Sequence, residues 1–503
     1  MKLHLIFTLA LTTLLFTTQA QIQLGADIDG EAAGDRSGNS VSISSDGSRV
    51  AIGAVDNGGN GSNAGHVRIY EWTGSSWIQL GADIDGEAAS DNSGRSVSIS
   101  SDGSRVAIGA NGNDGNGSNA GHVRIYEWTG SSWIQLGADI DGEAVNDLSG
   151  YSVSISSYGS RVAIGAYQND GNGSNAGHVR IYEWTGSSWI QLGADIDGEA
   201  ADDRSGYSVS ITSDGSRVAI GAYLNDGNGA AAGHVRIYEW TGSSWIQLGA
   251  DIDGEALGDE SGNSVSITSD GSRVAIGALN NDGNGAAAGH VRIYEWTGSS
   301  WIQLGADIDG EAVYDYSGWS VSISSDGSRV AIGANGNDGN GLDAGHVRIY
   351  EWTGSSWIQL GADIDGEAAD DQSGRSVSIS SDGSRVAIGA STNDGNGANA
   401  GHVRIYSLGA ITVSSENMER TNSVSTNLIA YPNPTTNEVM VRLPKTYSNV
   451  SAKVTDITGR VVSTHQYQNV SYLQLDVNAP SGIYFIEIIT DGNEKTVLKL
   501  IKE

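Results

Sequence analysis

The sequence contains seven near-copies of one stretch, and each copy carries four acidic residues at the same positions. In the first copy they are Asp27, Asp29, Glu31 and Asp35. Carboxylates spaced in this way could hold Ca²⁺, which takes about six to eight oxygen ligands in proteins. Gly30, however, stands where a calcium-binding loop would place a ligand. The alternative is turn and capping chemistry, in which Asp side chains accept hydrogen bonds from nearby backbone N–H groups. Ca²⁺ is the only cofactor for which the sequence offers ligands, and both interpretations stay open.

Histidine recurs once in each copy, beginning with His66. Zinc ligands usually come as close pairs on one element, whereas these histidines are spaced by one full repeat, so we predict buried or hydrogen-bonded structural histidines. An active site needs a few unlike residues in one asymmetric geometry. Here every candidate carboxylate or histidine is repeated, and no GxSxG, HExxH or phosphate-binding loop occurs. We therefore predict that the protein is not an enzyme.

Three positions differ freely from copy to copy and are rich in Tyr, Trp, Arg and Asn, which are favoured at recognition surfaces. The first reads Asn39, Arg95, Tyr151, Tyr207, Asn263, Trp319 and Arg375. The second reads Arg36, Asn92, Leu148, Arg204, Glu260, Tyr316 and Gln372. The third reads Val55, Asn111, Tyr167, Tyr223, Leu279, Asn335 and Ser391. The position of Gly34, which includes Tyr314, varies similarly.

These variable positions predict a binding face. Drift at tolerant loop positions is the alternative, but drift would also yield many Ser, Thr, Ala and Lys, which are scarce at these positions. The predicted ligand-binding residues are Arg36, Asn39, Arg95, Tyr151, Tyr167, Arg204, Tyr207, Tyr223, Tyr314, Tyr316, Trp319 and Arg375. The metal-binding candidates are Asp27, Asp29, Glu31 and Asp35.

The elements that would position these residues are short β-strands. The stretch GADIDGEA begins at Gly25 and recurs six times at a constant spacing, without an insertion. Each copy contains four short runs of strand character and no 3.6-residue apolar period; in the first copy they are 40–44, 49–53, 66–72 and 77–80. Seven four-stranded antiparallel units predict a seven-bladed β-propeller. An open solenoid is disfavoured because no capping repeat is visible.

The ends of the repeat region favour closure of a ring. Residues 21–24 resemble a fourth strand without the preceding three, and residues 376–406 supply three strands without a fourth. We therefore predict that the N-terminal strand completes the last blade. In a four-stranded antiparallel blade, the fourth-to-first and second-to-third connections emerge on one face. All the freely varying positions lie in or beside these connections, so one face of the disc should be diversified.

Three motifs in each copy resemble the FG-GAP repeat of integrin α-subunit propellers. In the first copy they are Ser37 to Val41, Val50 to Ala54 and Gly65 to Tyr70. The resemblance covers all seven copies and implies a seven-bladed propeller. Ser37 stands where the family has Phe, and the family's calcium loop is reduced here to a Ser-Ser-Asp-Gly-Ser turn. A lone aspartate cannot cage Ca²⁺, so we do not expect the family's calcium sites.

Net charge, cysteine content and local composition limit the partners and the location of the protein and mark its domains. The net charge is −33, which argues against nucleic acid and anionic membranes as partners, and there is no cysteine for disulfides. Residues 1–20 have the pattern of a secretory signal peptide, with a short apolar run before a small-residue cleavage site. Residues 21–406 are the repeat region, 407–427 a polar linker, and 428–503 a separate module. No other segment could cross a membrane.

The last module resembles the C-terminal sorting domain of type IX secretion cargo. The matching marks are Tyr-Pro-Asn-Pro from Tyr431, Asp456 with Gly459 and Arg460, Gly482-Ile-Tyr, and a terminal Lys-Leu-Ile-Lys. The resemblance implies a small immunoglobulin-like β-sandwich, contact with secretion machinery, and a secreted or surface location. We predict a secreted adhesion protein that recognises a glycan or a protein through the diversified face. A structural matrix component with cation-binding acidic loops and no specific partner is the alternative.

Overall fold

The computed structural model describes residues 21–409, 429–431, 438–456, 460–476, 479–480, 482–490 and 495–502. Their regular structure consists of β-strands, and none of these residues forms a helix that could span a membrane. The chain divides into two compact units, 1–413 and 414–503. The predicted signal peptide and most of the predicted linker lie outside the described residues.

Each of the seven sheets starts with two strands joined by a tight turn, which is of the predicted Asp-Gly type in six sheets and contains Tyr158-Gly159 in the third. The first strands alternate small polar and apolar residues: β3 (Ser37–Ile43), β8 (Ser93–Ile99), β13 (Ser152–Ile155), β18 (Ser208–Ile211), β23 (Ser261–Ile267), β28 (Ser320–Ile323) and β33 (Ser376–Ile379). The second strands are β4 (Arg49–Ala54), β9 (Arg105–Ala110), β14 (Arg161–Ala166), β19 (Arg217–Ala222), β24 (Arg273–Ala278), β29 (Arg329–Ala334) and β34 (Arg385–Ala390).

The third strand of each sheet carries the recurring histidine at its start. These strands are β5 (His66–Trp72), β10 (His122–Trp128), β15 (His178–Trp184), β20 (His234–Trp240), β25 (His290–Trp296), β30 (His346–Trp352) and β35 (His402–Ser407). Antiparallel pairing joins first to second and second to third strands throughout.

The outer edge of each sheet is formed by two short pieces that both pair with the third strand. The first pieces are β6 (Trp77–Gln79), β11 (Trp133–Gln135), β16 (Trp189–Gln191), β21 (Trp245–Gln247), β26 (Trp301–Gln303), β31 (Trp357–Gln359) and β1 (Ile22–Gln23). The second pieces are β7 (Ile84–Asp85), β12 (Ile140–Asp141), β17 (Ile196–Asp197), β22 (Ile252–Asp253), β27 (Ile308–Asp309), β32 (Ile364–Asp365) and β2 (Ile28–Asp29). The sequence analysis found the first piece and missed the second.

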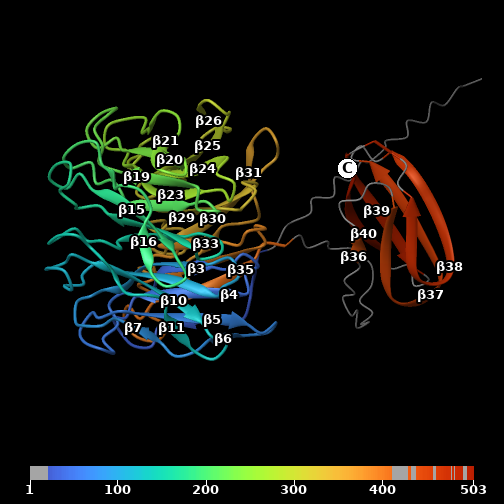
Figure 1. The fold of residues 1–503 in the computed structure, drawn as a ribbon, viewed down its shortest axis with the longest axis horizontal. Coiled ribbons are helices and arrows are strands. Elements are labelled where there is room, and N and C mark those ends of the chain that lie inside the picture. Colours follow the sequence, from blue (N-terminus) through green and yellow to red (C-terminus); the bar gives the residue numbers. More distant parts are fainter. Residues whose placement is uncertain are drawn as a thin grey trace, which may run out of the picture. The chain divides into compact units, whose positions relative to one another are not determined.

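Repeated hydrogen bonds join the seven sheets into a closed ring. The Ser40 hydroxyl donates to the Gly94 carbonyl of the next sheet at 2.8 Å, and the bond recurs at every junction. Ser376 closes the ring by donating to Gly38. The first strands β3 and β33 are likewise in contact, and β3 lies beside β35 in Figure 1 although the two are far apart in sequence. The unit is a seven-bladed β-propeller.

The N-terminal strand β1 completes the seventh sheet, as predicted. Ile22 pairs with Ser407 and Gln23 with Tyr406 in antiparallel register. The Leu24 backbone N–H donates to the Ile405 carbonyl at 2.7 Å, and the Leu24 carbonyl accepts the Trp77 indole N–H at 2.8 Å. The seventh blade therefore contains strands from both ends of the repeat region.

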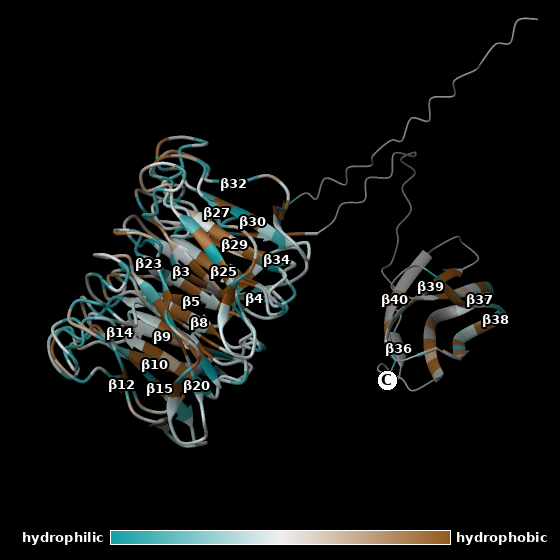
Figure 2. Ribbon diagram, turned by 90° about the horizontal axis from the view of Figure 1, so that it is seen from above, coloured by the Kyte–Doolittle hydropathy of each residue, from teal (hydrophilic) through white to brown (hydrophobic). Residues whose placement is uncertain are grey.

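The propeller core lies between neighbouring sheets. One cluster joins Ala51, Val67 and Ile69 of the first sheet to Val106 and Ile108 of the second, and equivalent clusters fill the other junctions. Figure 2 shows the hydrophobic residues on the strands and more hydrophilic ones in the loops. Gly53 has to be a glycine because an added Cβ would collide with the Gly94 carbonyl of the next sheet. Sheets this close need small residues on their faces.

The C-terminal unit is an antiparallel sheet of five strands. They are β36 (Ile429–Tyr431), β37 (Glu438–Asp456), β38 (Val461–Asp476), β39 (Gly482–Thr490) and β40 (Lys495–Lys502). One half of the long strand β37 pairs with β36 and the other half with β39, while β38 follows both halves. Side chains from both halves share one hydrophobic core. The immunoglobulin-like topology expected for this unit stays a prediction.

Candidate functional site

The seven residues at the position of Asn39 line a single pocket of about 160 Å³ at one mouth of the propeller channel. They are Asn39, Arg95, Tyr151, Tyr207, Asn263, Trp319 and Arg375. Each stands within three residues of the start of the innermost strand of its sheet, so seven copies of one sequence position meet around the ring axis. Six of them were predicted binding residues. Asn263 was missed, although its place in the repeat could have identified it.

Four tyrosines form a continuous aromatic cluster on one side of this mouth. The Tyr151 ring lies 4.8 Å from that of Tyr207, and Tyr167 and Tyr223 pack against these two at 4.5 and 4.3 Å between ring centroids. Arg204 lies over the Tyr167 ring at 5.6 Å. Tyr167 and Tyr223 come from the second-to-third connections, so they support the pocket tyrosines from behind. Burial raises the pKa of Tyr207, and the neighbouring Tyr151 raises it further.

A second group surrounds Trp319. The Arg375 guanidinium lies 4.5 Å from the centre of the Trp319 ring, and Tyr316 lies 6.5 Å from it. Tyr314 follows at 6.3 Å from Tyr316 and is more than half exposed. Trp319 therefore belongs both to the pocket and to an aromatic row that leads outward from it.

Arg36 is a predicted binding residue that does not line the pocket and pairs with an acidic residue instead. Its Nε lies 3.2 Å from a carboxylate oxygen of Asp56, and its side chain is half exposed. All seven residues at its position have a positive φ, between 53° and 58°. Only Gly, Asn and Asp adopt this backbone region at low cost, whereas the chain places Arg, Leu, Glu, Tyr and Gln here as well.

The opposite mouth of the channel is uniform. Its pocket, of about 140 Å³, is lined by serines and isoleucines in equivalent positions, such as Ser101, Ser157 and Ile99. The serines and isoleucines at this mouth show that a ring of seven blades can be built with the same residue types at equivalent positions. The different residue types at the first mouth are therefore not required by the propeller geometry. The prediction that both kinds of variable connection emerge on one face agrees with their contacts, since the Arg36 N–H donates to the Asn399 carbonyl and the Asn92 side chain donates to the Val55 carbonyl.

The four acidic candidates do not converge on one ion. Asp35 is buried and accepts the Ala32 backbone N–H at 2.9 Å, which is the capping role that the sequence analysis left open. Its equivalent Asp91 accepts the backbone N–H of Ala88 at 3.0 Å and the side chain of Asn113 at 3.2 Å. Asp29 is exposed, and its backbone carbonyl accepts a bond from Arg68.

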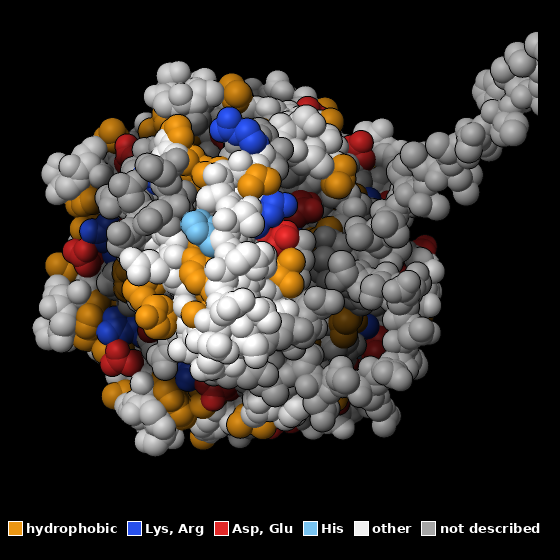
Figure 3. Space-filling model, turned by 90° about the vertical axis from the view of Figure 1, so that its right-hand side faces the viewer, with side chains coloured by type: hydrophobic (Ala, Val, Ile, Leu, Met, Phe, Trp, Pro, Cys, Tyr) orange, Lys and Arg blue, Asp and Glu red, His pale blue; other side chains and the backbone are white. Residues whose placement is uncertain are grey.

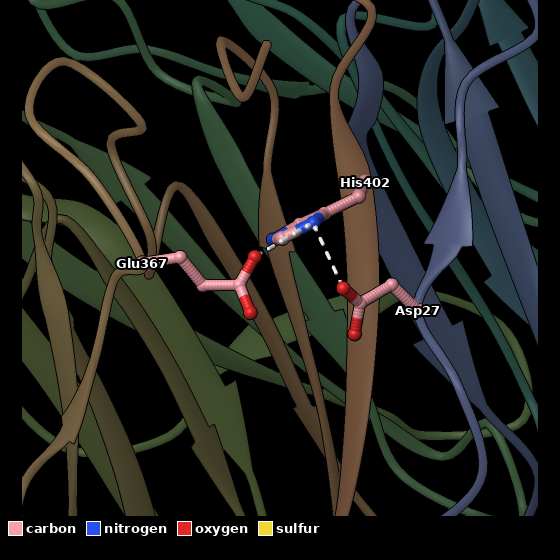
Figure 4. Close-up of side chains that lie close together, drawn as sticks. All are labelled: Asp27, Glu367 and His402. Carbon is pink, nitrogen blue, oxygen red and sulfur yellow. Dashed lines mark ion pairs between the residues drawn. The ribbon is translucent and has the colours of Figure 1, made fainter. Parts of the chain in front are cut away.

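Glu31 and Asp27 instead take part in clusters with histidine. The His66 Nδ1 lies 3.9 Å from Glu31 and 3.9 Å from Asp83, which belongs to the following copy. Figure 4 shows the equivalent cluster in which Glu367 and Asp27 reach His402 from two separate segments. The described part of the chain contains seven such groups, and within each the ligand atoms lie within 4.8 Å of one another. The histidines are buried, as predicted.

Asp46 lies in the turn that corresponds to the calcium-binding loop of FG-GAP repeats, and its carboxylate is used within the turn itself. Its Oδ1 accepts the Ser44 hydroxyl at 2.8 Å and the Ser48 backbone N–H at 2.9 Å. These bonds belong to the turn itself, and in the third copy Tyr158 replaces the aspartate altogether. The residues present therefore offer no cage for the family's ion at this loop.

The recurring tryptophans are used for packing at the outer rim. The rings of Trp72 and Trp77 lie 5.2 Å apart, and the Trp77 indole N–H donates to the Leu24 carbonyl of the neighbouring blade. On the face drawn in Figure 3, hydrophobic side chains of the described residues form small separate groups among charged and polar ones. The candidate site is thus the variable pocket rather than an exposed apolar surface.

Sequence comparisons identify both units. Residues 83–126 and 307–350 match the FG-GAP repeat, and residues 429–503 match the secretion system C-terminal sorting domain. No curated protein matches the chain. The chain thus carries FG-GAP repeats followed by a type IX sorting domain, and it is a secreted or outer cell-surface protein.

Several solved structures are similar in fold. A putative 6-phosphogluconolactonase from Bacteroides uniformis matches at 10% identity with a TM-score of 0.46, covering 65% of this chain and 85% of the other. The β-propeller domain of the Trilobed protease from Pyrococcus furiosus matches at 11% identity with a TM-score of 0.40, covering 68% and 88%.

Proposed function

We propose that this secreted or surface-displayed propeller is an adhesion protein that recognises an extracellular glycan or protein through the pocket at its variable mouth. The observation that carries the proposal is the pocket itself, because seven equivalent positions supply three aromatic residues, two arginines and two asparagines to one small space. Aromatic and arginine side chains are those that most often anchor binding partners. The sorting domain supplies the contact with the secretion machinery and the route to the surface.

Backbone geometry supports recognition over drift. The position of Arg36 has a left-handed backbone in every blade, so a side chain such as that of Leu148 or Tyr316 costs on the order of 1 kcal/mol relative to glycine. Residues selected for folding alone would tend toward Gly or Asn. Retaining bulky and charged side chains in strained positions is typical of sites where those side chains contact a partner.

Binding rather than catalysis fits the lining of the pocket. None of its seven residues is a carboxylate, a histidine, a serine or a lysine, so the pocket lining lacks the residues most often used for general acid–base or nucleophilic chemistry. The tyrosine that is most buried there, Tyr207, has its pKa raised by burial and stays protonated. The proposal is therefore a binding module without enzymatic activity.

The first prediction concerns the aromatic side of the pocket. We expect Trp319→Ala and Tyr207→Ala to weaken binding to a glycan or protein ligand by about tenfold or more, since each removes a central aromatic anchor. A glycan array followed by equilibrium titration of the full-length protein measures this loss. Tyr158→Ala is the matched control, because Tyr158 is 84% exposed and lies in a first-to-second turn on the opposite face. Equal affinity of Trp319→Ala, Tyr207→Ala and the wild type would refute the proposed site.

The Glu–His–Asp clusters favour a second candidate, a structural component stabilised by cations. Two carboxylates and one imidazole are ligands for Zn²⁺ or Mn²⁺, and carboxylates alone for Ca²⁺. A cation bound only by the folded state raises the melting temperature by mass action. This candidate predicts that Zn²⁺, Mn²⁺ or Ca²⁺ raises the Tm of the propeller by several degrees and that EDTA lowers it again. Calorimetry with and without each ion decides, and an unchanged Tm rejects the candidate.

A further inference from the structure

Charge is distributed unevenly between the pocket and the rest of the protein. The whole chain carries a net charge of −33, yet the pocket lining contains two arginines and no carboxylate. The variable mouth is thus locally cationic in an acidic protein.

The two pocket arginines lack the acidic partner that most other arginines of the propeller have. Arg49 lies 2.8 Å from Glu71, and the same pair recurs in five other blades. Arg95 instead donates to the Tyr151 hydroxyl and lies over the Tyr151 ring at 4.2 Å. Arg375 lies over Trp319. Among the described residues, no carboxylate oxygen lies within 4 Å of either guanidinium, so their charges face the pocket without a counter-ion from the protein.

The arrangement around the ring is asymmetric. Arg375, Asn39 and Arg95 come from three successive sheets and form one side of the pocket. Trp319 comes from the next sheet and lies beside Arg375, while Tyr207 comes from a sheet across the ring. Asn39, from the sheet between those of the two arginines, donates its side-chain amide to the Arg95 backbone carbonyl at 3.2 Å. Burial lowers the pKa of Arg375, and the positive charge of Arg95 lowers it further. An anion placed between the two would relieve both effects.

We infer that the pocket selects an anionic sugar, with a carboxylate or sulfate group held between Arg95 and Arg375 and the sugar ring lying against Tyr207 and Trp319. The inference rests on the proposed recognition function and names its ligand class. Guanidinium groups bind planar and tetrahedral oxyanions through paired, charge-assisted hydrogen bonds. Aromatic faces accept the apolar face of a sugar, so a neutral sugar fills only half of the interactions that the pocket offers.

The test compares matched sugars on the full-length protein. Oligosaccharides ending in glucuronic acid, in 6-sulfated glucose and in plain glucose are titrated against the wild type by calorimetry. We expect the glucuronate or the sulfate probe to bind at least about tenfold more tightly than the neutral one, and the stronger of the two identifies the oxyanion. Equal binding of all three overturns the anionic inference but keeps glycan recognition. Binding of none overturns the anionic inference and the glycan form of the proposed function, which leaves protein recognition.

Two variants locate the anion. Arg95→Asn and Arg375→Asn introduce the residue that Asn39 and Asn263 already carry at the same position, so the blade fold tolerates the change. Each is expected to remove the preference for the anionic probe and to leave weak binding of the neutral one. Tyr158→Ser at the opposite face is the control, and thermal unfolding confirms that the variants stay folded. A variant that keeps the full anionic preference shows that its arginine is not the anion's partner.

Discussion

Lowering the pH from about 6.5 to 4 is expected to remove most of the stability of the propeller. Burial lowers the pKa of the recurring histidines, and the neighbouring Arg68-type guanidinium lowers it further, while the two adjacent carboxylates oppose the shift. For His178, His234 and His290 the pKa falls to about 4. A pKa depressed in the folded state means that the unfolded chain takes up protons first as the pH falls.

The loss of unfolding free energy is large because the buried histidine occurs once in every blade. A shift from 6.5 to about 4 is equivalent to about 3 kcal/mol for each of these three histidines, present in full above pH 6.5 and lost toward pH 4. The other four shift in the same direction. A total unfolding free energy is usually about 5–15 kcal/mol, so a loss repeated in several blades is a large fraction of the stability.

Denaturant unfolding at pH 7, 6 and 5 measures the loss, and NMR titration of the imidazoles measures its cause. His234→Gln should reduce the slope of the unfolding free energy against pH, because one residue fewer takes up a proton on unfolding. A stability that stays flat between pH 6.5 and 4.5, or imidazoles that titrate near 6.5, would show that the histidines are not held neutral by the fold.

Removing the leucine of the closing strand is expected to destabilise the propeller as strongly as removing its counterpart within a continuous blade. Leu24 packs into the cluster between the seventh and first sheets and binds both neighbours through its backbone. Leu80 has the same contacts one repeat later, with its N–H on Ile69 and its carbonyl on Trp133. Truncating a partly buried leucine to alanine costs about 2 kcal/mol.

Leu24→Ala and Leu80→Ala should therefore lower the free energy of unfolding by similar amounts. Ile22→Ala is the control, because Ile22 is half exposed at the sheet edge and should cost little. Chemical denaturation compares the three variants. If Leu80→Ala is costly and Leu24→Ala is not, the N-terminal strand does not close the ring in solution.

The repeat made most of the propeller predictable. A constant period places each residue in the same setting seven times, so the strands could be worked out from one copy. The closure followed from the two incomplete ends of the repeat region, and the diversified face from comparing the copies. The second outer strand piece, such as β7, was missed because Ile84 and Asp85 are too short a run to show a strand pattern. It is positioned by pairing with His66 and Val67 of the third strand.

The acidic clusters could not be predicted from the linear run of acids. Ile28 faces the core between Asp27 and Asp29, and Asp35 turns into its own loop, so the four carboxylates are dispersed. The contacts that do form join His66 to Glu31 and to Asp83 of the next copy. Such a group depends on how neighbouring blades pack, which no single copy reveals. The sequence also could not predict that Arg95 and Arg375 lack an acidic partner, because this too depends on how neighbouring blades pack.

The most direct test of the recognition site is to make its seven positions identical. Replacing Arg95, Tyr151, Tyr207, Trp319 and Arg375 together with Asn gives every blade the residue already present at Asn39 and Asn263. The account predicts a folded propeller, with a Tm within a few degrees of the wild type, that no longer binds the sugars recognised by the wild type in the same titration. Undiminished binding by this uniform propeller would contradict the claim that the variable mouth is the recognition site.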